Sequence, residues 1–330
     1  MAQRVANSLY NFRETFRVVN KDVLRWFPGH MGKGLRQMQQ RLKLVDCVIE
    51  VHDARIPLSG RNPNFRHTVS GVKPHILVLN KKDLSDLQMK SEVEAVLRKD
   101  GFNHIFYSNC KDSKCPGMKQ IIPAVVKLVS SSERYNRSEE KDFSVMVIGV
   151  PNVGKSSLIN ALRSKYLGKG KAAPVGAVAG ITRSVQNRIK VSDKPLVYLL
   201  DTPGILTPNI SDTEMGLRLA LCACLQDHLV GVEIIADYLL YWLNKNNKFR
   251  YLEIMGLDEP TDDIGTVLTK CAVKLGKAQR RRDVVGSEYV WRPDLSAAAH
   301  YFIKAFRNGD LGRVMLDTQQ LTSSVSLVGS

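Results

Sequence analysis

Cysteine is sparse in this sequence of 330 residues, and none of it is arranged for metal binding. No two cysteines have C-x-x-C spacing, and no cysteine–histidine cluster resembles a zinc site. This pattern is typical of ordinary thiols in a reducing compartment. The six cysteines are Cys47, Cys110, Cys115, Cys222, Cys224 and Cys271.

Long apolar runs are also missing. A membrane-spanning helix needs about 18 or more mostly apolar residues. The best candidate stretch, 217–243, is interrupted by Asp227, His228, Glu233 and Asp237. We therefore predict no membrane span.

Acidic residues are in deficit, with 32 Asp and Glu against 48 Lys and Arg, so that the net charge is +16. Such an excess favours a polyanionic partner, either a nucleic acid or an anionic membrane surface. A soluble basic protein without such a partner would have the same composition. The length predicts two domains, since one domain usually takes about 100–200 residues.

The N-terminal stretch, residues 1–20, has three arginines and one acid. Arg4, Arg13 and Arg17 flank a face of apolar residues, and Glu14 is the acid. This composition is typical of a mitochondrial targeting segment. An N-terminal helix that packs on the following domain is the alternative.

Residues 149–157, GVPNVGKSS, fit the phosphate-loop pattern G-x-x-x-x-G-K-[ST]. An apolar run that predicts a buried strand precedes them, and an amphipathic helix follows. Glycines let the backbone turn so that N–H groups face phosphate oxygens, and the helix adds its positive end. We expect Lys155 to reach the β- and γ-phosphates and Ser156 to bind Mg²⁺. The other expected phosphate-contacting residues are Asn152, Val153, Gly154, Ser157, Thr182 and Gly204.

A second strand, residues 75–80, ends in N-K-x-D, formed by Asn80, Lys81 and Asp83. Guanine presents its N1–H and 2-amino group side by side, and a carboxylate such as that of Asp83 accepts both. Adenine lacks this pair of donors, so the motif favours GTP. Asn80 would hold the loops together, and the Lys81 stem would cover the base.

A third strand, 105–108, leads to the loop expected to touch the base last. Its residues Ser108 and Asn109 stand where GTPases usually have Ser-Ala. We keep both as base-contacting residues, because contact at this place is largely through backbone N–H groups.

Residues 201–204, DTPG, form a D-x-x-G motif after a further apolar strand. Asp201 would hold Mg²⁺ through water, and the Gly204 N–H would meet the γ-phosphate. Thr182, in GITR, is a further expected Mg²⁺ ligand. A flexible linker is the alternative for the Gly- and Lys-rich stretch before it.

The motifs occur in a permuted order. GTPases usually have the phosphate loop first and N-K-x-D near the end, whereas here N-K-x-D and Ser-Asn come first. The sequence therefore predicts a circular permutation joined through the polar stretch 130–142, since domain termini commonly lie close together. The D-x-x-G segment then leads directly into the C-terminal part of the chain.

Strands alternate with helices before residue 205, which predicts an α/β fold with a mostly parallel sheet. We expect a P-loop GTPase domain over 21–212 and a small all-helical domain over 213–330. Two basic clusters are candidate RNA contacts, although either also fits a solvated helix face. One contains Lys33, Arg36, Arg41 and Lys43, and the other Lys274, Lys277, Arg280, Arg281 and Arg282.

WFPGHM, DARIPLS, LNKKDL, GVPNVGKSSLIN, GITR and DTPGIL, in this order, resemble the circularly permuted GTPases of the YlqF/RbgA family, and its mitochondrial members in particular. The resemblance covers the whole chain, most specifically before residue 210. It implies a monomeric, Mg²⁺-dependent GTPase that cycles between GTP and GDP. It also implies late assembly of the large ribosomal subunit, contact with its rRNA, and hydrolysis stimulated by the particle. The mitochondrial members imply the matrix, with peripheral contact with the inner membrane.

Catalytic residues are less evident. The residue after D-x-x-G is Ile205, which cannot orient water, whereas many GTPases have Gln there. The resemblance points to His30 of FPGHM as the catalytic histidine. Asn152 resembles the Asn of potassium-activated GTPases, which implies a K⁺ beside the phosphates. A membrane-associated GTPase switch and a non-hydrolysing GTP-binding scaffold stay open as alternatives.

Overall fold

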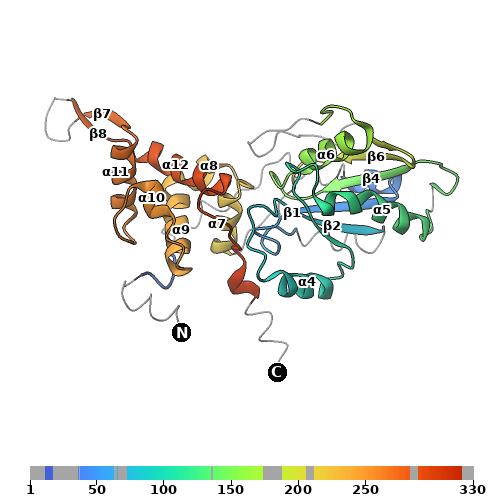
Figure 1. Cartoon of the computed structure of the whole chain (residues 1–330), viewed down its shortest axis with the longest axis horizontal. Helices are drawn as coiled ribbons and strands as arrows, with labels where there is room; N and C mark the ends of the chain where they lie inside the picture. Colours follow the sequence, from blue (N-terminus) through green and yellow to red (C-terminus); the bar gives the residue numbers. More distant parts are fainter. Residues whose placement is uncertain are drawn as a thin grey trace, which may run out of the picture. The chain divides into compact units, whose positions relative to one another are not determined.

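The computed structural model forms two compact units (Figure 1). The sheet unit contains Arg25–Ser211, Cys222–Gln226 and Arg313–Ser330. The helical unit contains Met1–Leu24, Asp212–Leu221 and Asp227–Gly312. The structure describes residues 12–17, 36, 38–62, 65, 73–134, 137–173, 188–205, 212–282 and 289–321.

The sheet unit is built on a six-stranded sheet in the order β3-β2-β1-β4-β6-β5. All neighbours are parallel except β5 and β6, which are antiparallel. The strands are β1 (Cys47–Asp53), β2 (His75–Asn80), β3 (Ile105–Tyr107), β4 (Phe143–Ile148), β5 (Ile189–Asp193) and β6 (Leu196–Asp201).

Strands β1 and β4 lie side by side, and the strand order reverses between them. From β1 it proceeds outward to β2 and β3, and from β4 it proceeds outward to β6 and then β5. Ligands of open α/β sheets bind at such a reversal, beside the carboxyl ends of the strands. The predicted phosphate loop follows β4, so the strand order places this loop beside the reversal.

Both faces of the sheet are covered, which explains why every residue of β1 is buried. Helices α5 (Pro116–Ser130) and α6 (Lys155–Leu167) cover one face, and the Tyr166 hydroxyl joins them by donating to Lys119 O at 3.1 Å. Helix α4 (Lys90–Lys99) covers the other face through Val93 and Leu97, which pack against β2.

The helical unit surrounds α9 (Val232–Lys245), most of which is buried. Asp263 and Asp294 cap α11 (Ile264–Lys274) and α12 (Leu295–Asn308) by accepting backbone N–H groups at 3.1 Å and 2.9 Å, which satisfies donors that have no partner within the helix. No helix in the described parts of the chain is long and apolar enough to cross a membrane. The other helices are α7 (Thr213–Leu221), α8 (Asp227–Val230), α10 (Tyr251–Met255), α11 (Ile264–Lys274) and α12 (Leu295–Asn308).

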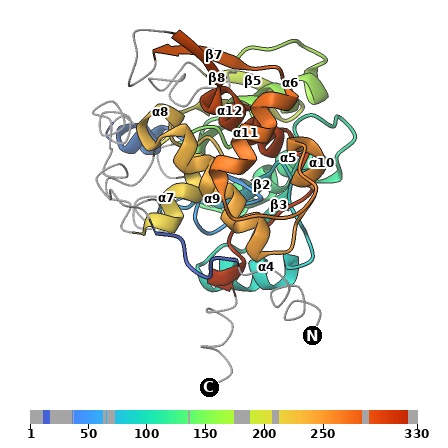
Figure 2. The ribbon, with the colours of Figure 1, turned by 90° about the vertical axis from the view of Figure 1, so that its left-hand side faces the viewer.

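An antiparallel pair of strands, β7 (Ala278–Arg282) and β8 (Tyr289–Pro293), belongs to the helical unit between α11 and α12 (Figure 2). We call it the β7–β8 ribbon. The sequence led us to expect an entirely helical domain, and this ribbon is the correction. AQRRR and YVWRP lack the apolar alternation that identifies a half-buried strand, and most of their described side chains are exposed.

Residues 12–17 pack against α9 inside the helical unit. The Arg13 guanidinium donates to both carboxylate oxygens of Asp237, at 2.7 and 3.1 Å. The ring of Phe16 lies 5.3 Å from that of Tyr238. The hydroxyl of Tyr241 donates to Glu14 O at 3.0 Å. These six residues are therefore part of a folded unit, whereas the targeting role of 1–20 stays a prediction.

Two segments beyond residue 212 belong to the sheet unit, which the sequence did not predict. Residues 222–226 form one, and the chain after Gly312 forms the other. In the second, the Asp317 carboxylate accepts the backbone N–H groups of Leu58 and Ser59 at 2.7 and 2.9 Å. Val314 donates to Leu84 O at 3.1 Å.

Candidate functional site

The loop between β4 and α6 has the backbone that the phosphate-loop motif requires. Gly149 and Gly154 have φ values of +144° and +100°. A Cβ at Gly149 would lie 2.3 Å from Val51 O, and one at Gly154 would lie 2.3 Å from Asn80 Nδ2. Only glycine fits either position. Helix α6 begins at Lys155, so its N-terminal end meets the loop, as a phosphate site needs.

Asn80, at the end of β2, connects three loops. Its amide nitrogen donates to Val153 O at 2.9 Å in the phosphate loop. Its amide oxygen accepts from Ser108 Oγ at 3.1 Å and Cys110 Sγ at 3.2 Å in the loop after β3. The side chain is almost fully buried. It therefore holds the expected base-contacting loop against the expected phosphate-contacting loop.

Lys81 lies between the phosphate loop and the end of β1. Its Nζ donates to Asn152 O at 2.7 Å and lies 3.0 Å from Asp53 Oδ2. Asp53 also accepts from Arg55 Nε at 3.0 Å and Nη2 at 2.8 Å. Burial raises the pKa of Asp53, but the charges of Arg55 and Lys81 outweigh it and hold that pKa well below its usual range. The sequence did not identify Asp53 and Arg55 as site residues, although DAR stands at the end of a predicted strand.

Asp83 has a buried carboxylate oxygen, Oδ1, that meets no hydrogen-bond partner among the described residues. Buried polar atoms are nearly always paired, so such an atom fits a ligand that brings donors. The N1–H and 2-amino group of guanine are donors of this kind. Asn109 Oδ1 accepts from Lys111 N at 2.9 Å, which leaves its backbone as the expected base contact.

At the start of α6, directly after the predicted phosphate loop, Ser156 Oγ donates to Asp201 Oδ2 at 2.5 Å. The second carboxylate oxygen, Asp201 Oδ1, is buried and has no partner among the described residues. Burial raises the pKa of Asp201, and the hydrogen bond from Ser156 and the charge of Lys155 partly offset this. A hydroxyl and a carboxylate are hard oxygen ligands, so the pair fits Mg²⁺. Bound there, Mg²⁺ would neutralise charge on the β- and γ-phosphates.

Lys155 is 6% exposed, and its Nζ donates to Gly149 O at 3.2 Å and Val150 O at 2.9 Å. The ammonium therefore lies over the loop that the motif predicts to hold phosphates. Burial lowers the pKa of Lys155 to about 8, against a smaller opposite effect of the Asp201 charge. A phosphate group beside it would restore the charged form.

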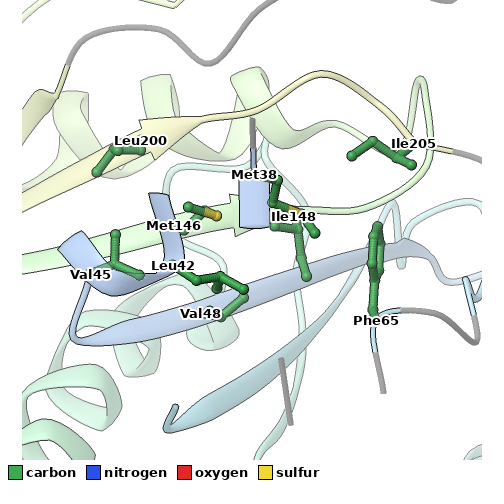
Figure 3. Close-up of a cluster of buried hydrophobic side chains, with 9 residues drawn as sticks. All are labelled: Met38, Leu42, Val45, Val48, Phe65, Met146, Ile148, Leu200 and Ile205. Atoms are coloured by element: carbon green, nitrogen blue, oxygen red, sulfur yellow. The ribbon is translucent and has the colours of Figure 1, made fainter. Parts of the chain in front are cut away.

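The side chain of Ile205 is packed in the core. It is 1% exposed and lies in a cluster of apolar side chains on one face of β1, β4 and β6 (Figure 3). Its N–H donates to Gly149 O at 3.2 Å, and its carbonyl accepts from Asn62 Nδ2 at 3.3 Å. The residue thus anchors the end of DTPG to the core and does not hold water. The other cluster members are Met38, Leu42, Val45, Val48, Phe65, Met146, Ile148 and Leu200.

Asn152, the residue expected beside K⁺, has a positive φ of +57° and donates from Nδ2 to Ala223 O at 2.8 Å. Ala223 itself has a φ of +60° and lies in the segment 222–226. A side chain of the phosphate loop is therefore held by a peptide far away in the sequence. Nothing in the sequence pointed to Ala223, because CAC has no motif character.

The structure thus brings most of the expected residues to the carboxyl edge of β1, β2, β4 and β6. Three others, His30, Lys33 and Thr182, lie outside the described residues. The side chains of Arg281 and Arg282 do so as well. Gly204 packs closely against Pro151 of the phosphate loop, since a Cβ at Gly204 would lie 2.5 Å from Pro151 N and Cα.

Comparison with known proteins gives concordant matches. Residues 144–270 match the family model described as 50S ribosome-binding GTPase. The chain is 60% identical to mitochondrial GTPase 1 of Aedes aegypti over 93% of its length and 97% of that protein. It is 54% identical to mitochondrial ribosome-associated GTPase 1 of Bos taurus over 94% of its length and 93% of that protein.

A solved structure matches as well. GNP-bound YlqF of T. maritima aligns over 86% of this chain and 97% of its own, with a TM-score of 0.54 and 25% identity. The match covers both the permuted sheet and the part of the chain after it.

Proposed function

The chain belongs to the YlqF/RbgA family of GTPases, and on that premise we propose that it binds the large subunit of the mitochondrial ribosome and hydrolyses GTP in a late step of its assembly. Contact with the particle stimulates this hydrolysis and so supports mitochondrial translation. The protein acts as a monomer in the mitochondrial matrix, with peripheral contact with the inner membrane. The mitochondrial names of its relatives and the arginine-rich N-terminus support this location.

One observation carries the GTPase part of the proposal. The buried oxygens of Asp83 and Asp201 lack partners among the described residues, and the two residues follow β2 and end β6, the strands on either side of the central pair β1 and β4. A ligand with donors at one end and a metal-bound phosphate at the other satisfies both. GTP with Mg²⁺ is such a ligand, because guanine brings the donors and the triphosphate brings the metal.

The phosphate loop and its neighbours bind and orient GTP but contribute no group to activate water. Lys155 offsets negative charge, and Ser156 with Asp201 supplies oxygen ligands to Mg²⁺. Ile205 faces the core, so water must be oriented by another group. In our proposal that group is His30, with Thr182 as an additional Mg²⁺ ligand and Asn152 beside a K⁺ that stabilises charge on the phosphates.

Phosphate release from GTP, measured for the full chain with purified mitochondrial large subunits, tests this function. We expect large subunits to raise the rate well above the intrinsic rate, and mitochondrial small subunits, as the control particle, to have no effect. Sedimentation with large subunits should be stronger in GTP than in GDP. A rate that large subunits leave unchanged would contradict the proposal and favour a GTP-binding scaffold.

The catalytic groups are tested separately. His30→Ala should keep GTP binding and the intrinsic rate but lose stimulation, so that equal stimulation in variant and wild type would exclude His30. Replacement of K⁺ by Na⁺ should slow hydrolysis by the wild type and have little effect on Asn152→Ala. An unchanged wild-type rate in Na⁺ would remove K⁺ from the mechanism.

A further inference from the structure

The β7–β8 ribbon has one face turned to solvent. Arg280 lies directly opposite Trp291 in the antiparallel register, and side chains two residues apart on a strand share a face, so Tyr289 joins them. Trp291 is 70% exposed and Tyr289 is 57% exposed. Of the described alternate positions, Gln279 and Val290 are half-exposed, whereas Arg292 is exposed. The face that carries the two rings and the guanidinium is exposed at Arg280, Tyr289 and Trp291.

The charge of the ribbon has one sign. Its two strands contain four arginines and no acidic residue. The Arg280 guanidinium carbon lies 4.7 Å from the centre of the Tyr289 ring, so a cation and a ring are already stacked on this face. Lys274 and Lys277, just before the ribbon, are exposed as well.

We propose that this face binds unpaired nucleotides of RNA. Trp291 and Tyr289 stack on bases, and Arg280 with the neighbouring basic residues contacts phosphates. Flat exposed rings interleaved with cations match a single strand, in which every base offers a flat face beside a charged backbone. In a duplex the bases are already stacked on each other, so the rings have nothing to stack on. This inference rests on the proposed ribosomal function and names the chemistry of one contact.

An anionic membrane fits the ribbon less well. Arg280 lies on the same face as the two rings, so inserting the rings into lipid would bury a charge. RNA binding needs no such burial, because each arginine can remain at a phosphate.

Binding of the full chain to a single-stranded RNA of about 12 nucleotides tests the inference. Stacking should quench the fluorescence of Trp291, seen as the difference between wild type and Trp291→Phe. Trp291→Ala should weaken binding roughly 5- to 150-fold, the range measured when one stacking ring is removed. Trp291→Phe keeps a ring and should retain most of the affinity. Tyr301→Ala, on α12 of the same unit and 39% exposed, is the matched control and should bind as wild type does.

Salt dependence tests the phosphate contact. Arg280→Ala should make the plot of log affinity against log salt shallower by about 0.7, the value for one phosphate contact on a single strand. Lys304→Ala, an exposed cation on α12, should leave the slope unchanged.

Three outcomes would overturn the inference. The first is that Trp291→Ala binds the single-stranded RNA as tightly as wild type, and the second is that wild type binds an RNA duplex of the same length with equal affinity. The third is that Trp291→Ala weakens binding to phosphatidylserine vesicles and leaves RNA affinity unchanged. Failure of the proposed function is a separate result. It would be seen as unstimulated GTP hydrolysis by the wild type with large subunits, whatever the ribbon binds.

Discussion

Removal of the Arg55 guanidinium would leave a buried carboxylate at the carboxyl end of β1 with too few partners. Arg55 is 2% exposed, and Asp53 is fully buried. The side chains meet in two hydrogen bonds, at 2.8 and 3.0 Å, and Asp53 also accepts the backbone N–H of Arg55 at 3.0 Å. We choose Arg55→Met, because methionine is a long unbranched side chain that fills most of the same space.

Breaking a buried ion pair by removing one partner costs about 3–5 kcal/mol. Asp53 would keep Lys81, whose Nζ lies 3.0 Å away, so we expect a loss near the lower end, about 3 kcal/mol. For a domain of about 150–250 residues this lowers the melting temperature by about 6–12 °C. Urea unfolding at pH 7, with the slope against urea compared between variants, measures the change directly.

The double variant Asp53→Asn/Arg55→Met removes the charge that Arg55 balances. It should recover a large part of the lost stability, because a neutral amide is cheaper to bury than an unpaired carboxylate. Arg98→Met is the control, since the Arg98 side chain is 54% exposed and its Nη2 lies 3.6 Å from Glu94 Oε2. Such a surface pair contributes about 0–1 kcal/mol.

The pH dependence has a definite sign. In the wild type the pKa of Asp53 lies below its value in the unfolded chain, so its contribution is present above that value and is lost as the pH falls through the folded pKa. Without the Arg55 charge, less opposes the effect of burial on the Asp53 carboxylate, so the pKa of Asp53 rises. The stability difference between wild type and Arg55→Met should therefore narrow as the pH falls through the raised pKa of Asp53 in the folded variant. A loss of less than about 1 kcal/mol at pH 7, or a double variant no more stable than the single one, would refute the reasoning.

Three further predictions concern the base, the phosphates and the N-terminal segment. Asp83→Asn should lower GTP affinity roughly 100-fold or more and raise affinity for xanthosine triphosphate, because an amide donates to the 2-oxo group of xanthine; competition binding measures both, and an equal loss for the two nucleotides would contradict it. At about pH 8.5 GTP binding should take up protons, because phosphates restore the charge that burial removes from Lys155. Calorimetry in two buffers of different ionisation enthalpy detects this uptake, and a buffer-independent enthalpy would exclude it. Arg13→Ala should destabilise the helical unit by roughly 1–2 kcal/mol through the lost contacts with Asp237, whereas Arg17→Ala, at an exposed position, should not; equal melting temperatures would count against a structural role.

The nucleotide edge of the sheet was predictable because its residues follow local rules. Strands β2 and β4 are mostly apolar runs. Strand β2 leads into N-K-x-D and β4 leads into the phosphate-loop motif, and the spacing of each motif indicates one kind of nucleotide contact. Gly149 and Gly154 are required by backbone angles, which a sequence pattern records directly. The alternation of strands and helices likewise predicted a mostly parallel sheet, whose strands bring their carboxyl ends to one edge.

Other parts depend on contacts that no local pattern contains. Asp53 and Arg55 look like surface residues in the sequence, and only the cover over both sheet faces buries them. Ala223 acts through its carbonyl, which every residue possesses. The β7–β8 ribbon is held by pairing between two short exposed strands, so its residues lack the alternation by which strands are recognised.

The order of the chain gives helix α7 an anchor at each end. Just before it, DTPG leads from β6 and is tied to the phosphate loop where Ile205 N donates to Gly149 O. Directly after it, the segment 222–226 returns to the sheet unit, where Ala223 O accepts from Asn152. Both anchors are hydrogen bonds to the predicted phosphate loop. In an unpermuted GTPase, D-x-x-G leads back into the same domain, whereas here the chain continues from it into the helical unit and returns to the sheet unit directly after α7.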